Sequence, residues 1–255
     1  MAPQEIVVIT GANTGIGLQI AKHLLRDYND RFYVFLGCRT LSKGEIAAKE
    51  IHDEGFKNCE ALHIDVTDDE SIAKAAKTVE ETKNRVDVLH VNAGICPDIE
   101  MLNAGESLSK TINVTMATNV AGAAQTAETF IPLLKKAENP RIVFMSSGLG
   151  SVTRYAMPSD YNMWPAYASS KAALNMMMLW FWRRFPEMKI NSCCPGFRST
   201  YLNHFGADAP AGSTPGKVED ATANAVRLTV LGKDGESGTF TEWKDKAEKW
   251  QTVPW

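Results

Sequence analysis

One tyrosine and one lysine stand at a spacing that suits proton transfer. Tyr167 and Lys171 are four residues apart in a stretch that predicts a helix over 166–185, so their side chains share one face. Among the six tyrosines, only Tyr167 has a lysine four positions further on. A neighbouring ammonium group stabilises a phenolate and lowers the phenol pKa from about 10. The pair therefore predicts a general acid and base.

Ser147 adds a hydroxyl to this pair. It ends a predicted strand and can donate to the same substrate oxygen that the phenol serves. Taken alone, Ser146-Ser147-Gly148 is equally explained by a polar turn after the strand.

A glycine-rich segment follows the first predicted strand and opens the first predicted helix. Glycine lacks a Cβ, so Gly11 can make the turn, Gly15 can admit a phosphate close to the backbone, and Gly17 can let helix and strand pack closely. The helix N-terminus there suits a dinucleotide pyrophosphate, although the stretch alone also fits an ordinary turn. The motif reads Thr10-Gly11-Ala12-Asn13-Thr14-Gly15-Ile16-Gly17.

The end of the second predicted strand bears on the choice of cofactor. Cys38 stands where an acidic residue would repel a 2′-phosphate, and Arg39 follows with a guanidinium that suits one. This favours NADP(H) over NAD(H), with a solvated surface charge as the alternative role for Arg39. Two later strand ends are further cofactor candidates or plain turns, namely Asp65-Val66 and Asn92-Ala93-Gly94.

Composition restricts the class of protein. The 255 residues are 44% hydrophobic and 22% charged, which is ordinary for a globular protein and excludes disordered and fibrous classes. The net charge is −3 without a basic block, so we expect neither nucleic acid nor membrane as a partner. The longest apolar run covers only residues 176–182, too short to span a bilayer.

Cysteine usage and the first residues bear on the compartment. Five cysteines without a Cys-x-x-Cys pair are typical of reduced thiols. The segment before residue 10 has no basic start and no long apolar stretch, so we expect no signal peptide and a cytoplasmic protein. We expect no bound metal.

Strands and helices alternate along the chain, which predicts a mostly parallel sheet covered on both faces. Thr67 and Glu70 have the spacing of a capping box, which predicts a helix from there to about residue 84. No linker divides the chain, so we expect one domain over 1–255. The predicted strands are 6–10, 32–38, 59–65, 86–91, 141–146 and 189–194, with a seventh at 238–241, and the other helices include 42–54, 112–137 and 166–185.

These residues together resemble the short-chain dehydrogenase/reductase superfamily, from about residue 6 to 250. The resemblance implies an α/β fold: a Rossmann-type, three-layer, doubly wound sandwich with a seven-stranded sheet. It implies that Tyr167 is the general acid and base, that Lys171 lowers its pKa and holds the nicotinamide ribose, and that Ser147 orients the substrate carbonyl. It also implies a water relay anchored by Asn119, and cofactor contacts from Pro195, Gly196 and Thr200.

Within that superfamily the chain is similar to carbonyl reductases, with three departures. Val91 stands where the family usually has a second asparagine, and Thr14 where many NADPH-preferring members have lysine. Ser147 and Tyr167 are 20 residues apart, which predicts an inserted loop through Tyr155, Met157, Tyr161 and Trp164 that walls the pocket.

The segment 197–216 predicts a substrate lid. It is rich in small residues and carries Phe197 and Tyr201, and with Tyr161 and Trp164 opposite it predicts a bulky apolar carbonyl or alcohol substrate. A plain surface loop is the alternative. The helix 166–185 is apolar around its circumference at 176–182, which slightly favours a homodimer or homotetramer over a monomer.

We therefore predict an NADPH-dependent reductase of ketones or aldehydes. One alternative keeps the fold but performs non-redox chemistry, such as dehydration or cyclisation. Another is a non-catalytic NADP-binding sensor, because a fold does not dictate function.

Overall fold

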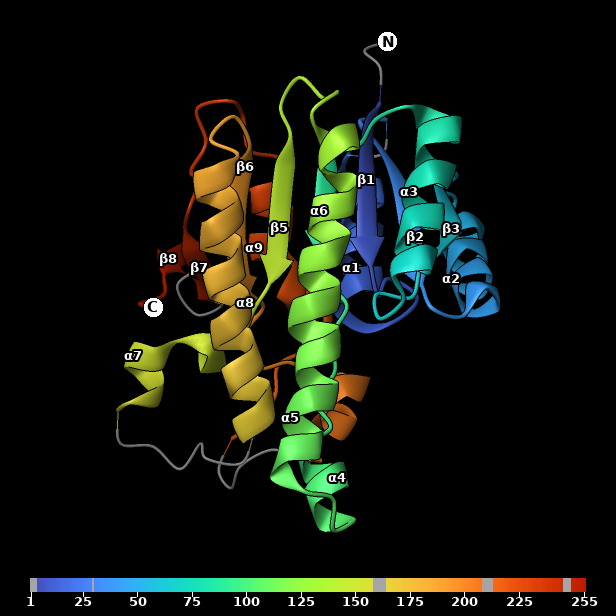
Figure 1. Cartoon of the computed structure of the whole chain (residues 1–255). Coiled ribbons are helices and arrows are strands. Elements are labelled where there is room, and N and C mark those ends of the chain that lie inside the picture. The colour runs from blue at the N-terminus through green and yellow to red at the C-terminus, as the bar shows by residue number, and fades with distance from the viewer. Residues whose placement is uncertain (1–3, 29, 158–163, 208–212, 245–248) are drawn as a thin grey trace.

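Eight strands form one sheet in the computed structural model, which describes residues 4–28, 30–157, 164–207, 213–244 and 249–255 (Figure 1). The strand order is β3-β2-β1-β4-β5-β6-β7-β8, and every neighbouring pair is parallel except β7 and β8. The strands are β1 (Glu5–Thr10), β2 (Phe32–Cys38), β3 (Cys59–His63), β4 (Val88–Val91), β5 (Arg141–Met145), β6 (Lys189–Cys194), β7 (Phe240–Lys244) and β8 (Lys249–Thr252).

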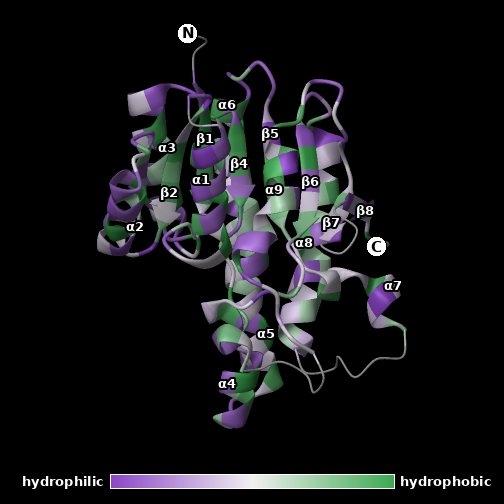
Figure 2. Ribbon diagram, turned by 180° about the vertical axis from the view of Figure 1, so that it is seen from behind, coloured by the Kyte–Doolittle hydropathy of each residue, from purple (hydrophilic) through white to green (hydrophobic). Residues whose placement is uncertain are grey.

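Helices cover both faces of the sheet. One face is covered by α3, α6 and α8, and the other by α1, α2 and α9 (Figures 1 and 2). The helices are α1 (Gly15–Tyr28), α2 (Leu41–Asp53), α3 (Asp69–Lys83), α4 (Asp98–Asn103), α5 (Leu108–Met116), α6 (Ala123–Leu134), α7 (Val152–Tyr155), α8 (Pro165–Arg184) and α9 (Thr222–Thr229). A π-helical segment, η1 (Ala117–Gly122), joins α5 to α6, and short 3-10 turns are η2 (Gly148–Gly150), η3 (Tyr201–Gly206) and η4 (Glu219–Ala221).

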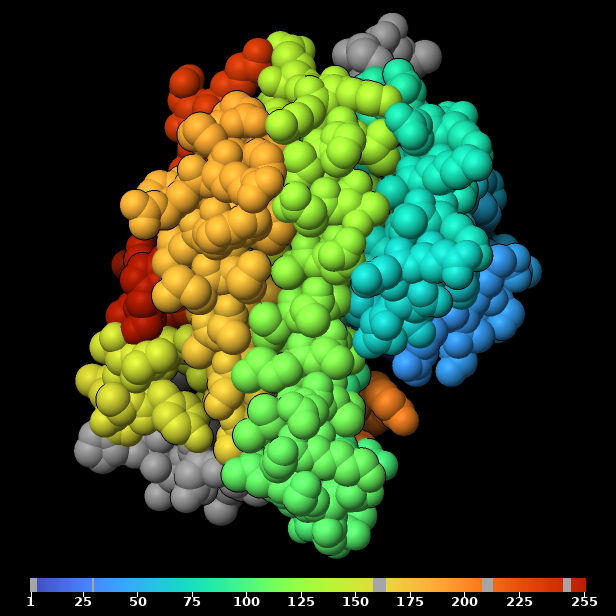
Figure 3. Space-filling model, in the orientation of Figure 1, coloured from blue at the N-terminus to red at the C-terminus, as the bar shows by residue number. Residues whose placement is uncertain are grey.

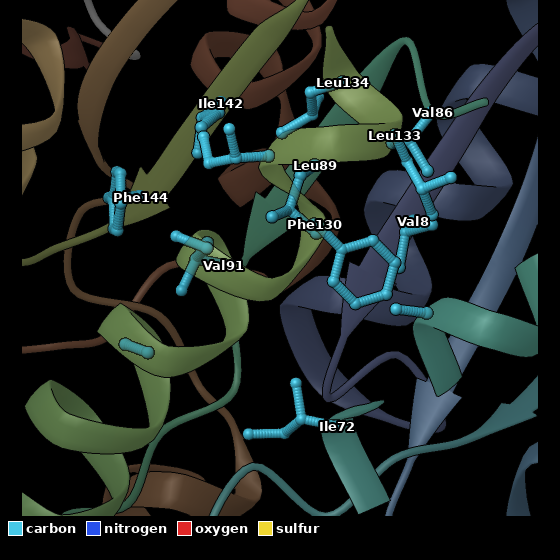
Figure 4. Close-up of a cluster of buried hydrophobic side chains, with 14 of the residues drawn as sticks. Val8, Ile72, Val86, Leu89, Val91, Phe130, Leu133, Leu134, Ile142 and Phe144 are labelled. Carbon is cyan, nitrogen blue, oxygen red and sulfur yellow. The ribbon is translucent and has the colours of Figure 1, made fainter. Parts of the chain in front are cut away.

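The sheet is held in place by two hydrophobic cores, because side chains of its strands are buried on both faces. Alternate residues of β1 enter two different cores: Val8 packs with α3 and α6, and Val7 with α1 and α2. Phe130 of α6 lies beside Val8 in the first core (Figure 4). The central strands are therefore fixed from both sides, and their carboxyl ends lie at the edge of the sheet where α4 and α7 project (Figure 1).

The predicted fold class is confirmed, with three corrections. The sheet has eight strands rather than seven, because the chain turns back after β7 and adds β8 antiparallel to it. The cap of α3 is Asp68, which accepts from the N–H groups of Glu70 and Ser71, whereas Thr67 donates its hydroxyl proton to Asp65. The helix predicted over 112–137 begins earlier, at Leu108, and is interrupted by η1.

The outer surface of α8 is open to solvent. The helix packs beside α6 and α5 across one face of the molecule (Figure 3). Met176 and Trp180 on its outer side are 65% and 44% exposed. Among the described residues, no helix combines the length and the apolar character that crossing a bilayer requires.

A fully buried histidine makes the core sensitive to acid. The Thr229 hydroxyl donates its proton to the Ala225 carbonyl, so the contact of 2.7 Å between His90 Nε2 and Thr229 Oγ1 requires a proton on Nε2. Nδ1 then carries a lone pair and has no partner among the described residues. Burial lowers the pKa of His90 from 6.5 to about 3, because a second proton would place an unpaired charge in the core.

We expect His90→Gln to reduce the loss of stability in mild acid. The unfolded chain binds a proton near pH 6.5 that the folded chain refuses, so stability falls as the pH drops below that value. Between pH 7 and 5 the wild type should lose about 2 kcal/mol more unfolding free energy than the variant, measured by urea titration. Parallel curves for the two proteins would contradict this, and the exposed His63→Gln serves as the control.

Candidate active site

The candidate site lies where the strand order reverses, between β1 and β4. Chains leave these neighbouring strands toward opposite faces of the sheet, which opens a crevice at their carboxyl ends. The loops after the two strands are tied together here. The Thr10 hydroxyl accepts from the N–H groups of Asn92 and Ala93 at 3.0 Å, and Asn92 Nδ2 donates to the Thr10 carbonyl at 2.8 Å.

The glycine-rich loop has the shape of an anion cradle. Gly11 and Gly15 adopt φ values of +67° and +58°, which other residues rarely take. A Cβ at Gly17 would lie 2.6 Å from the Gly11 carbonyl oxygen, so close packing of α1 on β1 requires glycine there. A Cβ at Gly15 would meet nothing within 4 Å, and α1 has no acidic residue in its first turn. Backbone N–H groups at this helix start are thus open to an anion.

The remaining loop residues of the motif line the same helix start. Thr14 is exposed, and Asn13 and Ile16 are half-buried. At the neighbouring strand end, Arg39 is exposed while Cys38 is buried against Gly44 of α2. This leaves a cation at the edge of the crevice.

Asp65 lies two residues beyond the end of β3, near Arg39. Its carboxylate accepts from the Thr67 N–H and hydroxyl, and these bonds, together with the charge of Arg39, outweigh burial and lower its pKa. Val66, next to it, has its carbonyl against Gly122. The predicted nucleotide positions 39, 65 and 66 therefore share one edge of the crevice.

Asn119 lies in the π-helical segment, and hydrogen bonds hold its side-chain amide in place. Its Oδ1 accepts from Ile95 N at 2.8 Å, and its Nδ2 donates to Ile95 O at 2.9 Å and to Ser170 Oγ at 3.0 Å. A Cβ at Gly94 would lie 3.2 Å from Asn119 Oδ1 and 3.5 Å from Lys171 Nζ. Asn119 thus joins the loop after β4 to α8, and π-helical turns are frequent at functional sites.

The predicted catalytic side chains come together beside this loop. Ser147 lies close enough to the Tyr167 phenol to lower the phenol pKa, and Ser147 Oγ accepts from Leu149 N at 3.2 Å. Lys171 Nζ lies 5.5 Å from the centre of the Tyr167 ring and donates to the Met145 carbonyl at 2.8 Å. Phenol, hydroxyl and ammonium therefore share one corner of the crevice.

Burial controls the charge of both groups in this corner. It raises the pKa of Tyr167 above its ordinary value of 10, with the neighbouring Cys96, Cys194 and Asp98 acting in the same direction. It lowers the pKa of Lys171 to about 8. Desolvation of the phenol is the largest of these effects, and the expectation that Lys171 lowers the pKa of Tyr167 stays a prediction.

The loop after β6 closes another side of the site. Cys194 Sγ accepts from Gly148 N at 3.1 Å and from Gly196 N at 3.4 Å, so one sulfur atom ties this loop to the turn after Ser147. Gly196 has a φ of +77°, and the buried Thr200 N–H donates to Asn203 Oδ1 at 3.0 Å. The predicted cofactor positions 195, 196 and 200 are thus part of one ordered turn.

The predicted substrate residues occupy different environments. Trp164 is buried directly before α8, whereas Phe197 is 37% and Tyr201 72% exposed. Tyr161 lies outside the described residues. An open cavity of about 580 Å³ is lined by Phe197 and Arg198 together with Glu242 and Lys244, on the β7 side of this loop.

Two groups near the site were missed by sequence analysis. Asp98, the first residue of α4, accepts from backbone N–H groups at the start of α8. Arg154 of α7 forms a bidentate ion pair with the buried Glu242 of β7, with N–O distances of 2.8 and 2.7 Å. These partners are 68 and 88 residues apart, and no local pattern in the sequence announces either contact.

Comparison with known proteins shows the family. A model of the short chain dehydrogenase family matches residues 5–209. The short-chain dehydrogenase/reductase ATR10 of the fungus Stachybotrys chlorohalonatus is 45% identical over 99% of this chain and 94% of its own. The short-chain dehydrogenase/reductase tropE of Talaromyces stipitatus is 33% identical over 94% of this chain and 99% of its own.

A solved structure matches the fold at full length. The NADPH-bound carbonyl reductase from chicken fatty liver covers 99% of each chain with a TM-score of 0.81 and 28% identity. The chain belongs to the short-chain dehydrogenase family, as its resemblance had predicted.

We expect Gly122→Ala to disturb the π-helical segment that carries Asn119. A Cβ at this position would lie 2.1 Å from the Val66 carbonyl oxygen, so the backbone must move. Overpacking of this kind costs about 1–3 kcal/mol, which urea unfolding would show as a lower midpoint. Gly232→Ala is the control, since a Cβ there meets nothing within 4 Å; equal losses in the two variants would contradict the steric account.

Proposed function

We propose that the protein is an NADPH-dependent reductase that converts a ketone or aldehyde into an alcohol. The observation that carries the proposal is the placement of the Ser147 hydroxyl and the buried Lys171 beside the Tyr167 phenol, at the mouth of the β1–β4 crevice. Two neighbouring hydroxyl groups suit a carbonyl oxygen that gains negative charge.

The crevice residues fit the nicotinamide dinucleotide. The open N-terminus of α1 and the space beside Gly15 suit the pyrophosphate, and the carbonyl reductase that shares this fold at 28% identity has NADPH bound. Asp65 and Val66 would meet the adenine, and Asn92, Ala93 and Gly94 would line the nicotinamide side. Pro195, Gly196 and Thr200 would contact the carboxamide.

Arg39 is proposed to select the phosphorylated cofactor. Its exposed guanidinium stands at the end of β2, and the neighbouring Cys38 brings no carboxylate to repel a 2′-phosphate. Thr14 supplies a hydroxyl where related reductases have a lysine, so Arg39 carries most of this selection.

Side chains of the protein then bind the carbonyl oxygen and deliver the proton to it. When bound in the crevice, the reduced nicotinamide would supply the hydride that the carbonyl carbon accepts. Ser147 holds the carbonyl oxygen and Tyr167 gives it a proton as negative charge develops there. Lys171 holds the nicotinamide ribose, and its ammonium group balances the phenolate that remains. Asn119 connects Ser170 of α8 to the Ile95 backbone and anchors the path by which the proton is replaced.

We infer an apolar, bulky substrate. Trp164 borders the start of α8, and Phe197 and Tyr201 present aromatic surface on the segment 197–216. We infer this segment to be a lid, of which residues 208–212 lie outside the described part of the chain. One domain over residues 1–255 would then carry both cofactor and substrate sites. A cytoplasmic location, and a second subunit over the exposed side of α8, stay predictions.

We expect Tyr167→Phe to abolish turnover and to keep cofactor binding. Removing a positioned acid costs about 10²- to 10⁴-fold in rate. Activity is followed as loss of NADPH absorbance with a panel of aromatic ketones, and NADPH affinity by fluorescence titration. Tyr28→Phe, at the end of α1, is the control. Full activity of the Tyr167 variant would refute the proposed acid, and product formed without NADPH loss would indicate non-redox chemistry.

We expect Arg39→Ala to weaken NADPH and to spare NADH. A charge-assisted bond to phosphate contributes about 1.5–3 kcal/mol, so kcat/KM for NADPH should fall about 10- to 100-fold. Arg26→Ala is the control, because this exposed arginine lies in the last turn of α1, away from the loop. Equal losses with both cofactors would contradict the assignment.

A further inference from the structure

A buried carboxylate caps the helix that carries Tyr167 and Lys171. Trp164, directly before α8, makes no side-chain capping bond, and Pro165 has no N–H to offer. Asp98 of α4 fills this place: its Oδ1 accepts from Ala166 N at 2.7 Å, and its Oδ2 accepts from Tyr167 N at 3.2 Å. Asp98 is fully buried.

We propose that Asp98 is a positioning residue for the reduction, which sets the depth and direction of the Tyr167 phenol by capping α8 from a separate helix. This rests on the proposed function. Asp98 bonds the backbone of Tyr167 itself, so a shift of the carboxylate moves the Cα from which the phenol extends.

The cap also couples the two halves of the site. Only three residues separate Asp98 from Gly94, where an added Cβ would lie 3.2 Å from Asn119 Oδ1 and 3.5 Å from Lys171 Nζ. The next residue, Ile95, exchanges two hydrogen bonds with Asn119. The same short segment thus lines the nicotinamide side and holds the start of α8. One stretch of backbone therefore positions both the phenol and the cofactor.

Burial raises the pKa of Asp98, and the hydrogen bonds that its carboxylate accepts oppose this shift. The described contacts bring it donors: the two α8 N–H groups and the Cys96 thiol, 3.9 Å from Oδ2. Other ionisable groups around the phenol are Lys171 and Cys194. The negative charge of Asp98 adds to the raised pKa of Tyr167 and so helps to keep the acid protonated.

An ordinary helix cap offers a matched control. Asp68 caps α3 through the N–H groups of Glu70 and Ser71, at 2.9 and 3.3 Å, with no contact to the catalytic side chains. Asp68→Asn and Asp98→Asn make the same chemical change at two helix starts. If both caps are purely structural, each substitution lowers the melting temperature and leaves kcat unchanged.

The experiment compares Asp98→Asn, Asp98→Ala and Asp68→Asn at saturating NADPH with a ketone that the wild type reduces. Misplacing a catalytic group by about 1 Å costs up to about 10²-fold, so we expect kcat to fall about tenfold in Asp98→Asn and about a hundredfold in Asp98→Ala. NADPH affinity, from fluorescence titration, should stay within about twofold, because the start of α1 is untouched. Asp68→Asn should keep wild-type kcat. Asp98→Asn keeps the side-chain volume, so it tests the positioning role even if Asp98→Ala does not fold.

The pH profile gives a second readout. Loss of the Asp98 charge lowers the pKa of Tyr167, so the alkaline limb of kcat should move to lower pH in Asp98→Asn and not in Asp68→Asn. Wild-type kcat and an unmoved limb in Asp98→Asn would overturn the proposal. Tyr167→Phe in the same assay separates the two hypotheses: full activity there contradicts the proposed function, whereas an inactive Tyr167→Phe beside an unimpaired Asp98→Asn contradicts the positioning role alone.

Discussion

The close approach of the loops after β1 and β4 is the constraint on which the site depends. A Cβ at Gly11 would lie 3.0 Å from the Cα of Ala93, and the Thr10 hydroxyl bonds the backbone of the facing loop. Because these strands are neighbours in a parallel sheet, residues about eighty positions apart meet at one edge. The crevice, the anion cradle and the segment that leads to Asp98 all follow from this contact.

Burial is the largest influence on the pKa of the Tyr167 phenol in this structure. Lys171 donates to the Met145 carbonyl and is itself desolvated, which lowers its own pKa to about 8. The same low-polarity environment strengthens every remaining hydrogen bond to the substrate oxygen.

Sequence patterns predicted those parts of the site whose residues are close together in the sequence. The glycine-rich loop and the spacing from Tyr167 to Lys171 are written within eight residues or fewer, and each was found where the pattern placed it. The alternation of strands and helices likewise predicted the parallel sheet, because buried strands need a continuous apolar run.

Contacts between segments that are distant in the sequence could not be predicted from it. Asp98 follows a proline, as many turn residues do, and its partners on α8 lie 68 residues further along. The break at η1 depends on Gly122 meeting the Val66 carbonyl, which no helical period encodes. At Thr67 the pattern was misleading, because Asp65 competes for the hydroxyl and leaves Asp68 to cap α3.

The antiparallel β8 has a consequence for how the molecules behave at high concentration. It occupies the outer edge of the sheet, where unpaired backbone groups could template strands from another molecule. Lys244 and Lys249 face each other across the last pair of strands, and Pro254 follows shortly after β8 ends. Positive charge and an absent N–H donor at this rim discourage edge-to-edge aggregation while leaving the rest of the sheet free to serve the crevice.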